Sequence, residues 1–150
     1  MHGHDEAARN ELELILRRLN LLPFILQNSS SGSKTLIEAL EARIINDAAF
    51  GIVLVTPDDV GYSIRDGEAG AKARARQNVV LEMGMVMAAL SRSRMVIIKK
   101  RGDVELPSDT DGIVRLEYQT RVQEQVPGLV QHLMDAGIAV DPALIADAAR

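Results

Sequence analysis

The spacing of hydrophobic positions along the chain predicts helices that alternate with buried strands. Apolar residues recur at helical spacing in four stretches. Three short runs are instead continuously apolar and rich in β-branched residues, as in parallel strands that are covered on both faces. The predicted helices span residues 6–19, 36–45, 76–90 and 122–136, and the buried strands span residues 50–56, 95–98 and 113–116. This alternation favours an α/β fold with a parallel sheet and right-handed crossovers.

Local signals add detail at the helix ends and in one short segment. Asp5 is the expected N-cap of the first helix. Thr35 and Glu38 form a capping box at the start of the second helix. Residues 21–26 are apolar and predict a strand, which Pro23 restricts to a sheet edge because proline has no N–H to donate. A short helix or tail is expected over residues 142–150.

The order of the elements indicates where a ligand would bind. In parallel sheets, ligands lie outside the carboxyl ends of the strands. The segments to examine are therefore the residues before the first helix and the loops over residues 28–34, 57–74 and 99–112. A sheet of this kind normally opens with a buried strand, whereas this sequence begins with what looks like the loop that follows one. Either upstream residues supply that strand, or the sheet lacks a central strand.

Length and composition narrow the class of protein. The 150 residues correspond to about one domain, which we take as residues 1–150. Lys and Arg number 17 against 21 Asp and Glu, a net charge of −4, which argues against a nucleic-acid partner. The absence of cysteine excludes thiolate zinc sites and cysteine nucleophiles. With no apolar stretch of about 18 residues and no signal peptide, we expect no membrane partner and a cytoplasmic location.

Glu82 is the candidate catalytic residue. It lies beside the apolar stripe of the helix over residues 76–90, and its helical neighbours Asn78, Met85, Val86 and Ala89 include no base that could form a salt bridge. A carboxylate in a half-apolar niche has a raised pKa, which is one mark of a functional site. The structural alternative is a Glu82 that is merely solvated at the edge of the stripe, or paired with an arginine from another element.

Three further side chains stand where a ligand could be held. Arg76 and Asn78 lie at the start of the same helix, whose positive end and free N–H groups attract anions such as phosphate. Asp58 and Asp59 follow the strand over residues 50–56 and could bind ribose hydroxyls or a metal. Solvated loop charges with local capping explain the first pair equally well. From the pattern alone, a capped turn is the favoured explanation of the second.

Two other patterns carry less weight. Residues 31–35 look superficially like a phosphate-binding loop, but the lysine does not directly follow the glycine and no glycine precedes at the required spacing, so a flexible lid loop is favoured. His2 and His4 form an H-x-H pair. The only other histidine is His132, and structural zinc usually takes four ligands, so no metal site is expected.

Four ordered blocks of the sequence resemble the bacterial TIR-like domains, a family described as predicted nucleotide-binding proteins. The blocks span residues 2–6, 56–61, 75–84 and 102–112. The third block is the most diagnostic, with the pattern Arg-Gln-Asn-Val-Val-x-Glu-x-Gly. The resemblance covers about residues 2–116. It implies a flavodoxin-like three-layer sandwich with a mostly parallel sheet, from which the first strand, before His2, is missing.

The resemblance also implies a function. The family includes effector modules of bacterial anti-phage systems whose active members cleave NAD at the nicotinamide–ribose bond, and their catalytic glutamate lies in the block that matches Glu82. An NAD nucleosidase in anti-phage or stress signalling is therefore expected, with NAD as substrate and no cofactor. Self-association that orders the loop over residues 28–34 is expected too. The expected substrate-binding residues are His4, Asp5, Asp58, Arg76 and Asn78.

Two other functions stay open. A non-catalytic module that binds a nucleotide or another TIR surface is favoured by two absences: a second obvious catalytic group, and room for the sensor domain to which effector members are usually fused. A nucleoside deoxyribosyltransferase-like enzyme would use a related sheet and a glutamate nucleophile.

Overall fold

A parallel sheet of three strands forms the centre of the molecule. The computed structural model describes residues 2–25, 36–102 and 104–150. The strand order of the main sheet is β1-β4-β6, with Gly51 paired to Met95 and Val96 paired to Val114. Its strands are β1 (Gly51–Val55), β4 (Met95–Lys100) and β6 (Val114–Tyr118). The predicted parallel sheet is confirmed, and the three buried strands lie within two residues of their expected ends.

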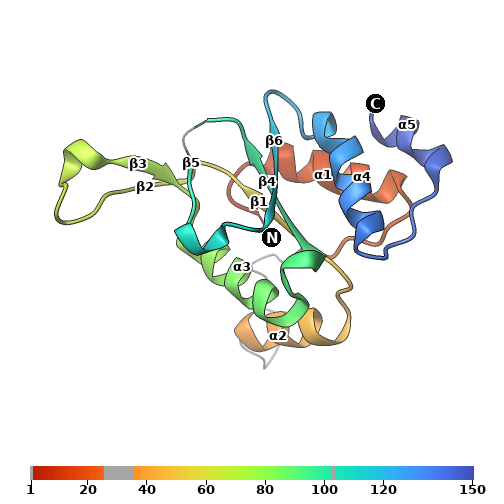
Figure 1. Cartoon of the computed structure of the whole chain (residues 1–150), viewed down its shortest axis with the longest axis horizontal. Helices are drawn as coiled ribbons and strands as arrows, with labels where there is room; N and C mark the ends of the chain where they lie inside the picture. Colours follow the sequence, from red (N-terminus) through yellow and green to blue (C-terminus); the bar gives the residue numbers. More distant parts are fainter. Residues whose placement is uncertain (1, 26–35, 103) are drawn as a thin grey trace.

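Helices cover both faces of this sheet (Figure 1). Side chains alternate between the two faces of a strand, so Leu54 of β1 enters one core while Val53 and Val55 enter the other. The first core is covered by α1 (Glu6–Arg18), α4 (Val126–Asp135) and α5 (Ile145–Ala148), and the second by α2 (Leu36–Asn46) and α3 (Gln77–Leu90). The molecule is thus a three-layer α/β sandwich with a flavodoxin-like arrangement, as expected.

A second small sheet lies beside the main one, where the sequence predicts only loops. Its strand order is β2-β3-β5, with β2 (Asp59–Gly61), β3 (Lys72–Arg74) and β5 (Val104–Glu105). The strands β2 and β3 form a hairpin that extends away from the body of the molecule (Figure 1). Arg74 forms a salt bridge with Glu105 across the β3–β5 pair. Strands of two or three residues are too short to show a hydrophobic period, which is why the loop predictions were wrong here.

The strand predicted over residues 21–26 is wrong across its described part. Residues 21–25 have no regular secondary structure, and Leu26 lies outside the described residues. Leu22 is 95% exposed and Phe24 is 58% exposed, so the apolar run that suggested a buried element is largely in contact with solvent. Pro23 has no N–H to donate to a neighbouring strand.

The helix predicted over residues 122–136 is divided in the structure. Its first part is the 3-10 turn η4 (Val122–Gln125), and the α-helix α4 begins only at Val126. Pro127 stands in the first turn of α4. Proline is tolerated there because that N–H would have no helical partner, whereas it disrupts a helix interior. The short tail helix expected after Asp141 is present as α5. The remaining 3-10 turns are η1 (Glu68–Gly70), η2 (Arg92–Arg94), η3 (Ser108–Thr110) and η5 (Pro142–Leu144).

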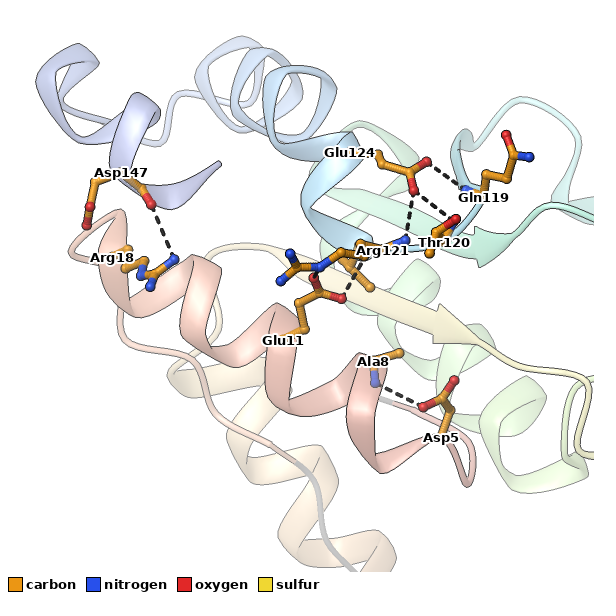
Figure 2. Close-up of polar contacts among 10 residues, drawn as sticks. Asp5, Ala8, Glu11, Arg18, Gln119, Thr120, Arg121, Glu124 and Asp147 are labelled. Carbon is orange, nitrogen blue, oxygen red and sulfur yellow. Dashed lines mark hydrogen bonds and ion pairs between the residues drawn. The ribbon is translucent and has the colours of Figure 1, made fainter. Parts of the chain in front are cut away.

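Polar contacts fasten α1 to the segment between β6 and α4 (Figure 2). Asp5 caps α1 as predicted, since its Oδ1 accepts a hydrogen bond from the N–H of Ala8 at 2.9 Å. Glu11 of α1 accepts from Arg121 Nε and from the N–H of Val122, both at 3.0 Å. These contacts fix the amino end of α1 and the loop before it. The capping box at Thr35 falls outside the described residues.

The amino end of the chain meets the outer edge of β1, the edge that faces away from β4. His2 forms a parallel bridge with Leu54 there. No regular strand is described on this side of β1 in residues 2–25, 36–102 and 104–150. A one-residue bridge therefore stands where the sequence leads one to expect a first strand. None of the described helices is long and apolar enough to cross a membrane.

Candidate functional site

A buried carboxylate lies directly beyond the carboxyl end of β1. The Asp58 side chain is only 6% exposed. Thr56 Oγ lies 2.9 Å from both Asp58 carboxylate oxygens, to which it can donate its proton. The backbone N–H of His4 donates to Asp58 Oδ1 at 3.1 Å. Two donors from segments far apart in sequence thus hold this carboxylate in place.

Gly3 permits the close approach between these segments. A Cβ atom at this position would collide with Asp58 Oδ2 and with Thr56 Oγ. Any other residue would push the segment before α1 away from β1. Gly3 was not among the predicted site residues. A glycine in the short segment that runs into the first helix is the signal that could have suggested it.

His4 connects Asp58 to the start of α3. Arg76, the N-cap residue of α3, donates from Nη1 to His4 Nε2 at 2.7 Å. Because a guanidinium cannot accept a hydrogen bond, the imidazole carries its proton on Nδ1 in this contact. That Nδ1 lies 3.9 Å from Asp58 Oδ1. The His4 side chain is 64% exposed, so the cluster lies where a ligand could reach it.

Glu82 lies one and a half turns further along α3. The side chain is half-buried. Burial raises the pKa of the Glu82 carboxyl, and the positive charge of Arg76 partly opposes this increase. Among the residues that the structure describes, none forms a hydrogen bond or a salt bridge with this carboxylate. A carboxylate that has lost part of its hydration without gaining a partner can interact strongly with a cationic ligand.

The structure brings some of the predicted site residues together and separates others. His4, Asp58 and Arg76 are in direct contact, and Glu82 is within electrostatic range of Arg76. Asp5 instead uses its carboxylate to cap α1. Asn78 is exposed.

The three histidines all have protein partners. His2 donates from Nδ1 to the carbonyl of Gly3 at 2.7 Å, and burial lowers the pKa of this imidazole. His132 donates from Nε2 to the carbonyl of Met95 at 2.9 Å and packs edge-to-face on Phe50. Within the described ranges, no group of three or more His, Asp or Glu side chains is arranged to hold a metal ion.

The main cavity is not at Glu82. A cavity of about 360 Å³ lies beside the outer edge of β1, and its lining includes Leu12, Leu16 and Val86. Neither Glu82 nor His4, Asp58 or Arg76 contributes to it. The candidate site is therefore an open cluster in the described part of the chain. The loop over residues 28–34, which the sequence suggests as a lid, lies outside the described residues.

Comparison with known proteins identifies the family. Residues 1–120 match the model of the TIR domain of CAP12/Pycsar effector proteins. The chain belongs to this TIR-domain family. The predicted TIR-like resemblance is thus confirmed, and the matched region contains the whole cluster from Gly3 to Glu82.

Individual relatives of this TIR domain come from bacteria and from a eukaryote. It is 38% identical to uncharacterized protein YuaY of Escherichia coli (strain K12) over 117 residues, which are 78% of this chain and 38% of that protein. It is 30% identical to protein tirC of Dictyostelium discoideum over 131 residues, 83% of this chain and 65% of that protein. It is 33% identical to the Pycsar effector protein PaPycTIR of Pseudomonas aeruginosa over 97 residues, 63% of this chain and 30% of that protein. The chain therefore spans less than two thirds of each relative.

Proposed function

We propose that this TIR domain cleaves NAD at the nicotinamide–ribose bond and that Glu82 is the catalytic residue. The observation that carries the proposal is the state of Glu82: a half-buried carboxylate with a raised pKa and no contacting cation, within a family of effector TIR domains. As the relatives include Pycsar effector proteins, we also propose that the domain acts as an effector module in anti-phage signalling.

The reaction demands little beyond one carboxylate. The nicotinamide ring of NAD is cationic while it is bonded to ribose, and it leaves as a neutral molecule, so no general acid is needed. The electron pair of the breaking C–N bond goes to nicotinamide, and positive charge develops on the ribose. Water then adds to the anomeric carbon and loses a proton, which gives nicotinamide, ADP-ribose and H⁺. Glu82 would stabilise the cationic ribose, as one carboxylate does in glycoside cleavage.

The partly dry position of Glu82 suits this role. A carboxylate in bulk water interacts weakly with a nearby cation, because the high dielectric constant screens both charges. The cost of placing Glu82 in a half-buried position is met by the fold before substrate arrives. The attraction gained as the ribose becomes cationic is then available to lower the barrier.

The neighbouring cluster would hold the rest of the substrate. Arg76 uses one of its five N–H donors on His4, and the others can bind a phosphate oxygen of NAD. Asp58 fixes the backbone of His4 and so fixes the partner of Arg76. Asn78, on the exposed first turn of α3, is placed to contact the same phosphates. Asp5 has the least scope to bind substrate, since its carboxylate caps α1.

The direct test is to incubate the protein with NAD and measure free nicotinamide by chromatography. We expect release by the wild-type chain and a loss of at least about 100-fold in the Glu82→Gln variant. Glu68→Gln is the matched control, because it makes the same charge change at an exposed position on the β2–β3 hairpin. If wild type and Glu82→Gln are equally inactive even at high protein concentration, the enzymatic proposal is lost.

The open geometry of the cluster supports a second candidate function. Because the main cavity does not include Glu82, a single copy of the described chain does not enclose NAD. A module that binds a nucleotide without turnover fits this observation. Calorimetric evidence of nucleotide binding with no nicotinamide after long incubation would favour it. Exchange of bases between nucleosides in a parallel assay would instead indicate deoxyribosyl transfer.

The same observation suggests that self-association completes the site. We propose that a second copy of the chain closes the cluster over the substrate. Specific activity should then fall as the protein is diluted. A constant specific activity down to nanomolar protein would show that a single copy is sufficient.

A further inference from the structure

The cavity beside β1 has no part in the proposed reaction. It has a volume of about 360 Å³. Its lining includes Leu12 and Leu16 of α1 together with Val86 and Leu90 of α3. The α1 residues belong to the core on one face of the sheet, and the α3 residues pack in the core on the other face. The cavity therefore lies at the level of the sheet itself, where the two cores meet beyond the outer edge of β1.

The backbone around this cavity has the geometry of a parallel strand position. Gly51, Ile52 and Leu54 of β1 all line it. The bridge between His2 and Leu54 is parallel, so a segment that leads into His2 runs in the same direction as β1. Continued backwards from His2, that register places successive residues opposite successive positions of β1, from Val53 to Gly51. Their side chains would point alternately into the two cores.

The rim of the cavity is also apolar. Leu21 to Ile25 line it, and Leu22 and Phe24 leave large apolar surfaces in solvent. Exposed apolar side chains that gather beside an apolar cavity commonly mark a surface that another segment covers. Pro23 prevents this segment from moving in as a regular central strand, because proline cannot donate to the ladder.

We propose that the slot, defined as the outer edge of β1 with this cavity, takes one apolar β-strand of about five residues that runs parallel to β1 directly into His2. An extended segment fits because it would fill the layer between the two cores, which is the width of one strand. Apolar side chains are required on both faces, since charged ones would be buried without partners. Continuity with the His2–Leu54 bridge selects a segment joined to the amino end of the chain over one from a second copy.

The proposal is tested with two chains extended by five residues immediately before Met1. One carries Val-Ile-Val-Ile-Val. The control carries Val-Pro-Val-Pro-Val, which is also apolar but has lost the N–H groups that alternate positions need for strand pairing. The measurements are the Tm and the hydrogen exchange of the amides over residues 51–54, both compared with the unextended chain.

We expect the Val-Ile extension to raise the Tm by about 5 °C or more and to slow exchange over residues 51–54 by roughly tenfold or more. The proline-containing extension should change neither. Equal behaviour of the two extensions would overturn the proposal. So would protection that appears only in a dimer, detected by light scattering after size-exclusion chromatography, because the strand would then dock on a second copy.

A second measurement covers the case in which an extended chain fails to fold. The same two five-residue segments, made as peptides with a Lys-Lys tag at the amino end, are titrated into the unextended chain. Slower exchange over residues 51–54 with the Val-Ile peptide and not with the Val-Pro peptide supports the proposal. The absence of any difference between the peptides overturns it.

Discussion

At the scale of single residues, Glu82 and Gly3 illustrate two ways in which a site is shaped. Burial raises the pKa of Glu82, and the charge of Arg76 offsets this only in part. Gly3 has no side chain, and this lets Asp58 accept a hydrogen bond from His4. The sequence could predict Glu82, because no base stands at helical spacing from it. It could not predict that Gly3 lies against Asp58, since that contact joins positions 55 residues apart (58 − 3).

The raised pKa of Glu82 predicts a variant that is inactive but more stable. The folded state favours the protonated carboxyl, so the free energy of unfolding falls as pH rises from the unfolded pKa, about 4.3, through the folded value. The Glu82→Gln variant lacks this loss. Because the side chain is only half-buried, solvent screening limits the gain, and we expect its Tm at pH 7 to be about 1–2 °C higher than that of wild type.

Thermal denaturation of both proteins between pH 3.5 and pH 7.5 measures this difference. It should disappear below about pH 4, where the wild-type carboxyl is protonated in both states. A variant less stable than wild type at pH 7 would show that Glu82 is stabilised by a partner. For the same reason, the acid limb of the activity profile should lie above the range of an ordinary glutamate.

Replacement of Gly3 should disturb the site through sterics alone. In Gly3→Ala, the new methyl group meets Asp58 and Thr56, so the segment before α1 must move. We expect a loss of about 1–3 kcal/mol in the free energy of unfolding, measured by urea denaturation. Gly84→Ala is the matched control, because nothing lies near the added Cβ and alanine favours the helix, with an expected gain of up to about 1 kcal/mol. Equal effects at the two glycines would contradict the contact.

At the scale of elements, helices were easier to predict than short strands. The helices α1, α2 and α3 begin and end within two residues of the expected positions, since each has a long apolar face or a clear capping residue. The hairpin of β2 and β3 was missed because its stability comes from backbone pairing and from the salt bridge of Arg74 with Glu105, which leave no periodic pattern. The apolar residues 21–25 were misassigned, because apolar character alone does not guarantee burial.

The start of η4 depends on one carboxylate. Glu124 accepts hydrogen bonds from the N–H groups of Gln119, Thr120 and Arg121 at 2.7–2.8 Å, and these bonds lower the pKa of Glu124 (Figure 2). A carboxyl with a lowered pKa stabilises the fold above its unfolded pKa, and this contribution is lost as pH falls through the folded value. We therefore expect Glu124→Gln to lower the Tm at pH 7 by about 2–4 °C.

This deficit should shrink on acidification, as the wild-type carboxyl takes up a proton. Scanning calorimetry at pH 7 and pH 3 provides the comparison. Glu68→Gln, on the exposed hairpin, should leave the Tm unchanged at both values of pH. A deficit in Glu124→Gln that stays constant with pH would mean that the charge of the carboxylate is unimportant.

At the scale of the whole molecule, the layered architecture follows from the sequence and the completeness of the sheet does not. Alternating elements and continuous apolar strands were sufficient to predict helices on both faces. The sequence also left open whether a first strand is present, and the structure shows a one-residue bridge at that position together with an apolar cavity. Packing of this kind joins residues from four helices and a strand, so no local pattern could reveal it.

The projecting hairpin has a consequence for how the chain tolerates a break. Arg65 is exposed beside a fully exposed Ile64, and no strand of the main sheet passes through this turn. Brief digestion with trypsin should therefore cut first after Arg65 and leave residues 1–65 and 66–150 associated, because each fragment contributes strands or helices to both cores. The nicked protein should elute as one particle under native conditions and separate in denaturant. The two fragments, produced separately, should then reassemble when mixed.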